Sequence, residues 1–118
     1  MTEEKLAARL GLRPTWQMRL VWWRLLVIAR WWPQQLEWQN RWMARYQQLG
    51  EAAADQMNNA DSQIGLILLS AGVYRDLSCL VPAYEQRWRE ALSDAFIYAD
   101  NMGLDEEICQ AIGRLRFG

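Results

Sequence analysis

Hydrophobic residues recur along the chain at helical intervals, and no stretch shows the long polar and apolar alternation of a half-buried strand. Proline, glycine and small polar residues stand between these stretches, where they would start or stop a helix. The pattern predicts an all-α fold. In chain order, the predicted helices cover residues 3–10, 15–31, 33–49, 51–60, 64–71, 82–102 and a last segment that begins after Asp105.

Several of these boundaries depend on single residues. Pro33 is expected to open the third helix, Gly50 to close it, and Gly72 to close the helix over residues 64–71. Residues 51–60 are expected to form a helix that frays or turns at Asn58 and Asn59. Periodicity alone cannot decide whether the uncharged run 64–71 is a buried strand or a buried helix. Because the other predicted elements are all helices, we expect a buried helix here as well.

The predicted second helix carries large apolar residues on two sides. One side holds Met18, Val21, Trp22, Leu25, Ile28, Ala29 and Trp32, and the other holds Trp16, Arg19, Trp23 and Arg30. A helix of this kind is either central in its bundle or covered by another chain, because soluble monomers rarely expose large apolar patches.

The other long helices have clearer inner stripes. The third is expected to bury Leu36, Met43 and Tyr46, with Trp42 on the flank and Arg41 and Arg45 outside. Inner positions predicted for the last two helices are Tyr84, Trp88, Leu92, Ala95, Phe96, Ala99 and Met102, and then Ile108, Ala111, Ile112 and Leu115.

Composition fits one folded unit. The chain has 118 residues, of which 52% are hydrophobic and 23% charged, which is enough for one core and too little for two. We therefore expect a single domain over residues 1–118, a compact bundle of about five to six helices. The acidic start lacks the layout of a secretory signal, so the expected location is the cytoplasm. Cys79 and Cys109 are then expected to be small buried residues.

Charge is unevenly distributed along the chain. Residues 1–49 hold eight Lys and Arg against three acids, whereas residues 50–118 hold five against eleven. This asymmetry is typical of a surface with a basic face for an anionic partner and an acidic face. The alternative is that the two halves neutralise one another within the fold.

Residues for catalysis are scarce. The chain has no histidine, which removes the commonest general base and neutral metal ligand. No serine or cysteine stands beside an evident base, and the glycines form no phosphate-binding loop. The pair Glu90 and Asp94 has helical spacing, which is usual on a solvated face. We expect no enzymatic activity, no cofactor and no metal ion.

A membrane span is also not expected. Arginines interrupt the second helix, so its longest uncharged run, residues 25–29, is far below the roughly 20 apolar residues that a span requires. A helix lying in the membrane interface usually separates a polar from an apolar face, whereas this one has tryptophan on both.

One stretch resembles a DNA-binding family. LAARLGLRPTWQM is similar to the first part of a bacterial helix-turn-helix, with Leu6, Ala7, Leu10, Gly11 and Leu12 in the positions of its LAxxLG turn. The resemblance implies that the next helix reads a DNA groove. It ends at Gln17, where the family places a buried aliphatic residue.

Arginines and tryptophans of the first half point to a binding surface. They suit phosphate contacts and base stacking, and they are equally the residue types most enriched at protein-binding hot spots. We predict a non-enzymatic protein–protein interaction module, whose partner is a larger protein, a nucleoprotein complex or a second copy of the chain. The alternative is a nucleic-acid-binding subunit that uses the same face. The predicted site residues are Arg19, Trp23, Arg30, Trp38, Arg41 and Arg45.

Overall fold

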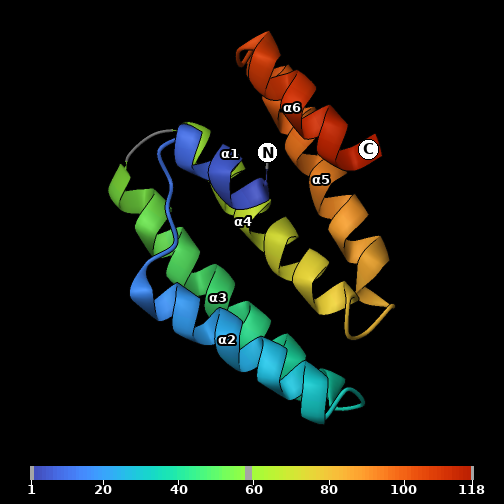
Figure 1. Ribbon diagram of the computed structural model, residues 1–118. Helices are drawn as coiled ribbons and strands as arrows, with labels where there is room; N and C mark the ends of the chain where they lie inside the picture. Colours follow the sequence, from blue (N-terminus) through green and yellow to red (C-terminus); the bar gives the residue numbers. More distant parts are fainter. Residues whose placement is uncertain (1, 58–59, 118) are drawn as a thin grey trace.

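The computed structural model describes residues 2–57 and 60–117, and this part of the chain is a bundle of six α-helices without strands (Figure 1). The predicted all-α fold of about five to six helices is confirmed. The helices are α1 (Glu3–Arg9), α2 (Trp16–Trp31), α3 (Leu36–Met57), α4 (Ala60–Ser78), α5 (Tyr84–Asn101) and α6 (Glu106–Phe117). None of these described helices is both long enough and apolar enough to cross a membrane.

Several helix ends lie where the sequence predicts them. The hydroxyl of Thr2 accepts a hydrogen bond from the backbone amide of Lys5, and Thr15 accepts one from the amide of Met18, so each satisfies an amide that the helix itself leaves free. After the end of α1, Gly11 has a φ of 95°, a left-handed conformation that side chains with a Cβ rarely adopt. These local signals separate α1 from α2.

Gly50 does not end the third helix, which corrects that prediction. It lies inside α3. A Cβ at this position would collide with Leu66 Cδ1 on α4, so only glycine fits without a shift. The glycine therefore allows two helices to approach closely instead of stopping one. Residues 51–57 continue α3, so the separate helix predicted over 51–60 is wrong. The turn predicted at Asn58 and Asn59 lies outside the described residues.

Gly72 is likewise internal to α4. A Cβ there would lie 3.5 Å from Glu3 Cβ and 3.6 Å from Trp22 Cη2, which places the glycine where α1 and α2 meet α4. The prediction of a buried helix over residues 64–71 is confirmed, but the helix continues to Ser78.

The turn between α2 and α3 also differs from the prediction. Pro33 does not open α3, which begins at Leu36. The buried side chain of Gln39 holds the turn, donating to the carbonyl oxygens of Trp32 at 3.2 Å and Pro33 at 3.4 Å. Leu36, predicted to be inside, is exposed, and so is Trp32, which helical spacing places on the side of Leu25. Helix α2 ends at Trp31 and α3 begins at Leu36, so neither residue lies inside a helix where the spacing would hold.

Helix α4 is the centre of the bundle. It contacts α1, α2, α3 and α5, while α6 packs against α5 and α1. Helices α2 and α3 form an antiparallel hairpin along one side of the molecule (Figure 1). The molecule is flat, with extents of 41 × 31 × 19 Å. Large side chains of the core include Leu25, Tyr46, Leu68, Leu69, Leu77, Leu92 and Ile112.

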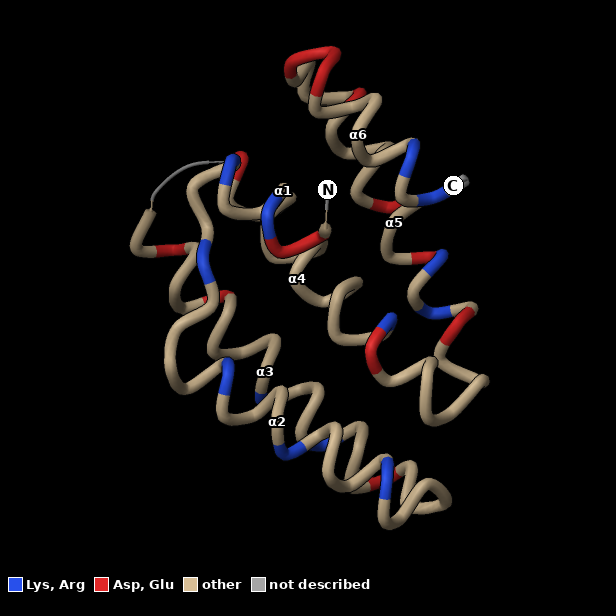
Figure 2. Tube along the Cα trace, in the orientation of Figure 1, with Lys and Arg blue, Asp and Glu red and all other residues tan. Residues whose placement is uncertain are grey.

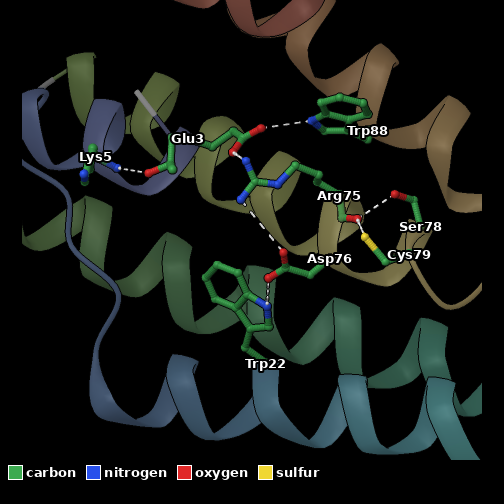
Figure 3. Close-up of polar contacts among 9 residues, drawn as sticks. Glu3, Lys5, Trp22, Arg75, Asp76, Ser78, Cys79 and Trp88 are labelled. Atoms are coloured by element: carbon green, nitrogen blue, oxygen red, sulfur yellow. Dashed lines mark hydrogen bonds and ion pairs between the residues drawn. The ribbon is translucent and has the colours of Figure 1, made fainter.

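A chain of polar contacts crosses this core (Figure 3). Glu3 is fully buried; its carboxylate pairs with the guanidinium of Arg75 at 2.6 Å and accepts a hydrogen bond from the indole of Trp88 at 3.0 Å. Next to Arg75, Asp76 accepts a 2.8 Å hydrogen bond from the indole of Trp22. The contacts join α5, α1, α4 and α2, so they fix the rotation of α2 relative to the central helix.

Candidate interaction site

Helix α2 lies at the edge of the bundle, not at its centre. One side of it is buried through Met18, Val21, Leu25 and Ala29. These side chains pack against α3 and α4, and no described helix covers the opposite side. Of the two arrangements that the sequence allows for a helix apolar on both sides, the structure has the one with an uncovered face.

The uncovered face carries a stripe of apolar residues, of which Val27 is half-buried and the others are exposed; we call it the α2 stripe: Trp16, Leu20, Trp23, Val27 and Trp31. The three tryptophans are 72%, 61% and 67% exposed, respectively. Successive members are three or four positions apart, the spacing that aligns side chains along one face of a helix. Such a stripe suits a helix or groove of another macromolecule.

A second exposed surface lies on α3. Trp38, Arg41, Trp42 and Arg45 line an open groove of about 500 Å³, which we call the α3 groove. The guanidinium of Arg24 lies 5.0 Å from the ring centroid of Trp42. Because Arg24 belongs to α2, this cation–π contact connects the two surfaces of the hairpin.

Aromatic side chains also cluster where the hairpin turns. The rings of Trp32 and Trp38 meet edge to face, with centroids 6.3 Å apart. The guanidinium of Arg30 lies 5.9 Å from the ring of Trp31. These contacts order the exposed rings against one another, which lowers the entropy lost when a partner binds them.

Ion pairs engage two of the four predicted arginines. Arg19 pairs with Glu4 at 2.7 Å and Arg41 pairs with Glu37 at 3.1 Å, whereas Arg30 and Arg45 form no ion pair with any described residue. Arginines occur along both helices of the hairpin, and α2 has no carboxylate (Figure 2). The hairpin is therefore a basic surface with part of its charge unmatched.

All six predicted site residues are exposed, but they form more than one group. Trp38, Arg41 and Arg45 meet in the α3 groove, whereas Arg19 and Trp23 line a separate hollow of about 280 Å³ beside Asp76. Arg30 stands apart from both. The predicted face is thus divided between the α3 groove, a hollow that α2 shares with α1 and α4, and Arg30.

Trp16, Leu20 and Trp31 belong to this exposed surface, although the predicted site did not include them. Their spacing with Trp23 is the sequence signal that identifies them. Trp22, which helical spacing places on the same side as Leu25, is half-buried; its indole donates a hydrogen bond to Asp76, and its ring makes an edge-to-face contact with Tyr46. Part of its ring still lines the hollow beside Arg19 and Trp23.

Some candidate chemical groups are placed differently from the prediction. Cys79 is exposed, not buried, because it follows the end of α4; Cys109 is half-buried, and burial raises the pKa of its thiol. Glu90 and Asp94 are exposed, as expected. Over residues 2–57 and 60–117, no three His, Cys, Asp or Glu side chains gather as a metal site would require.

Comparison with protein-family models, with curated proteins and with solved structures found no significant match to this chain.

Proposed function

We propose that the protein is a non-enzymatic protein–protein interaction module that docks through the α2 stripe and the α3 groove. The observation that carries the proposal is the exposure of Trp16, Trp23 and Trp31 along one side of α2. Large exposed apolar patches mark interaction sites, because leaving them in water is unfavourable. Trp and Arg are also the residues that most often dominate binding energy at interfaces.

A nucleic-acid partner is the second candidate. Arg30 and Arg45 stand beside exposed tryptophan rings, an arrangement that suits a single strand whose bases stack on the rings. The α2 stripe favours protein instead, since phosphate contacts need charge, whereas two of the arginines already pair with Glu4 and Glu37. Salt dependence distinguishes the two candidates. The logarithm of the affinity for a single strand falls linearly with the logarithm of the salt concentration, with a slope of about −0.7 per phosphate contact.

Retention of a partner by the immobilised protein tests the proposal. Extract from the cells that naturally produce the chain is divided, one half is treated with nuclease, and each half is passed over the wild type and over Trp16→Ala/Trp23→Ala. The matched control is Ile97→Ala/Tyr98→Ala, which removes two exposed apolar side chains from α5.

We expect the wild type and the α5 control to retain the same proteins. The α2 variant should retain at least tenfold less of each. Retention by all three proteins alike would contradict docking through α2. Binding that disappears with nuclease would support the nucleic-acid candidate.

A further inference from the structure

The side of α4 that faces away from α1 is the floor of an open groove. Helix α1 packs over Gly65 and Gly72. Ile67, Ser70 and Tyr74 project from nearly the opposite side of α4, because successive residues of a helix turn by about 100°. These three residues form part of the floor, and side chains of α3 and α5 form the walls of a groove of about 600 Å³.

The walls of this groove are acidic. Glu51 from α3 and Glu90 and Asp94 from α5 line it, with Arg87 as the one cation among its described lining residues. Neither Glu51 nor Asp94 forms an ion pair with the part of the chain described. Ser70 is 6% exposed and its hydroxyl makes no hydrogen bond with described residues. We call this surface the acidic groove.

The α2 stripe has the complementary chemistry. Beside its exposed tryptophans, α2 carries three arginines and no carboxylate. The guanidinium groups of Arg24 and Arg30 lie over the rings of Trp42 and Trp31, and neither arginine forms an ion pair with a described residue. One molecule thus has unmatched cations on one surface and unmatched carboxylates, Glu51 and Asp94, on another.

We propose that the α2 stripe of one copy docks into the acidic groove of a second copy. The inference rests on the proposed function and names the partner of the same site. Pairing of α2 with α2 is disfavoured, because it would oppose arginines with arginines. Since the stripe and the groove are different surfaces, the contact is heterologous and either closes into a ring or continues as a chain of molecules.

Sedimentation of charge-reversed variants tests this pairing. Arg24→Glu/Arg30→Glu removes the basic partner, and Glu51→Arg/Asp94→Arg removes the acidic one. We expect the mass of the sedimenting wild type to rise with concentration from 13.9 kDa to at least twice that value, whereas each variant alone stays monomeric. In an equimolar mixture the intact stripe of one variant meets the intact groove of the other, and the two reversed surfaces are again opposite in charge, so the mixture should regain the association that each variant alone has lost.

The control is Lys5→Glu/Arg114→Glu, which reverses two exposed charges outside both surfaces and should associate as the wild type does. Circular dichroism confirms that each variant is folded. If a variant is unfolded, its neutral counterpart, Arg24→Gln/Arg30→Gln or Glu51→Gln/Asp94→Gln, replaces it and should lower the association at least tenfold.

A wild type that is monomeric at every concentration, or a mixture of variants that does not pair, would overturn the self-pairing. Neither result would refute docking through α2, because retention of a different protein by the wild type and its loss in Trp16→Ala/Trp23→Ala is measured separately. Binding of nucleic acid by a monomeric wild type would also overturn the self-pairing.

Discussion

The indole of Trp88 donates a 3.0 Å hydrogen bond to the carboxylate of Glu3, which joins α5 to α1 across 85 positions of sequence. The same carboxylate is fully buried and pairs with Arg75. A buried carboxylate is stable only with such partners, because burial removes it from water. The contact therefore holds the short first helix on the bundle.

Removing the charge of Glu3 should destabilise the fold. We expect Glu3→Gln to lower the free energy of unfolding by about 2 kcal/mol, less than the roughly 3–5 kcal/mol of a fully buried pair, because Arg75 is 36% exposed. The control is Glu4→Gln, whose pair with Arg19 is solvent-exposed and worth at most about 1 kcal/mol. Urea unfolding measures the loss of stability in both variants. Equal losses would contradict a stabilising buried pair between Glu3 and Arg75.

Asp76 should make stability depend on pH. Burial raises the pKa of its carboxyl above the ordinary value of 3.8, although Arg75 and the hydrogen bond from Trp22 oppose the shift. Between these two pKa values the folded carboxyl keeps its proton while the unfolded one has lost it. This group therefore lowers the free energy of unfolding as the pH rises through that window.

Asp76→Asn removes the titration and keeps an oxygen for the indole of Trp22. We expect the stability of the variant relative to the wild type to increase as the pH rises above 3.8 and then to level off. Urea unfolding from about pH 3 to about pH 7 measures the difference. A difference that is constant or falls over this range would show that the carboxyl is not held in its protonated form.

Two buried tyrosines should respond oppositely to loss of the hydroxyl. Tyr84 donates a 2.6 Å hydrogen bond to the buried amide oxygen of Gln39, whereas the hydroxyl of Tyr46 has no hydrogen-bond partner among the described residues. Tyr84→Phe should cost about 1–2 kcal/mol, because it leaves a buried acceptor unsatisfied. Tyr46→Phe should be neutral or stabilising. Thermal unfolding that ranks the two in the reverse order would contradict these contacts.

Glycine substitutions test the close approach of α3 to α4. Gly50→Ala should destabilise the protein by about 1 kcal/mol, because overpacking against Leu66 outweighs the helical gain of roughly 1 kcal/mol. The control is Gly113→Ala in α6, where the new Cβ would lie 3.8 Å from Phe96 Cε2, an ordinary contact. The control should stabilise by about 0.5–1 kcal/mol, the ordinary helical preference for Ala over Gly. Stabilisation by both substitutions would contradict the close approach.

Local sequence signals predict much of this fold. Thr2, Thr15 and Gly11 act through atoms near them in the chain, so they fix the ends of α1 and the start of α2 correctly. Gly50 and Gly72 cannot be interpreted in this way, because their role depends on which helix crosses at that point. The burial of Glu3 is equally hidden, since its partners lie on α4 and α5.

The site is predictable only in part for a related reason. Helical spacing separates the two sides of α2 correctly, with Leu25 inside and Trp23 outside. It fails at Trp32 and Leu36, because α2 ends at Trp31 and α3 begins at Leu36. The spatial relation between the α2 stripe and the α3 groove depends on how the hairpin is packed.

Photo-crosslinking from position 23 tests the central claim most directly. Trp23 is replaced by p-benzoylphenylalanine in cells that naturally produce the protein, and Ile97, exposed on α5, is replaced in a matched control. The account predicts a protein adduct of discrete mass from position 23 and none, or a different one, from position 97. Absence of an adduct at position 23, or the same adduct from both positions, would show that the exposed face of α2 is not the docking surface.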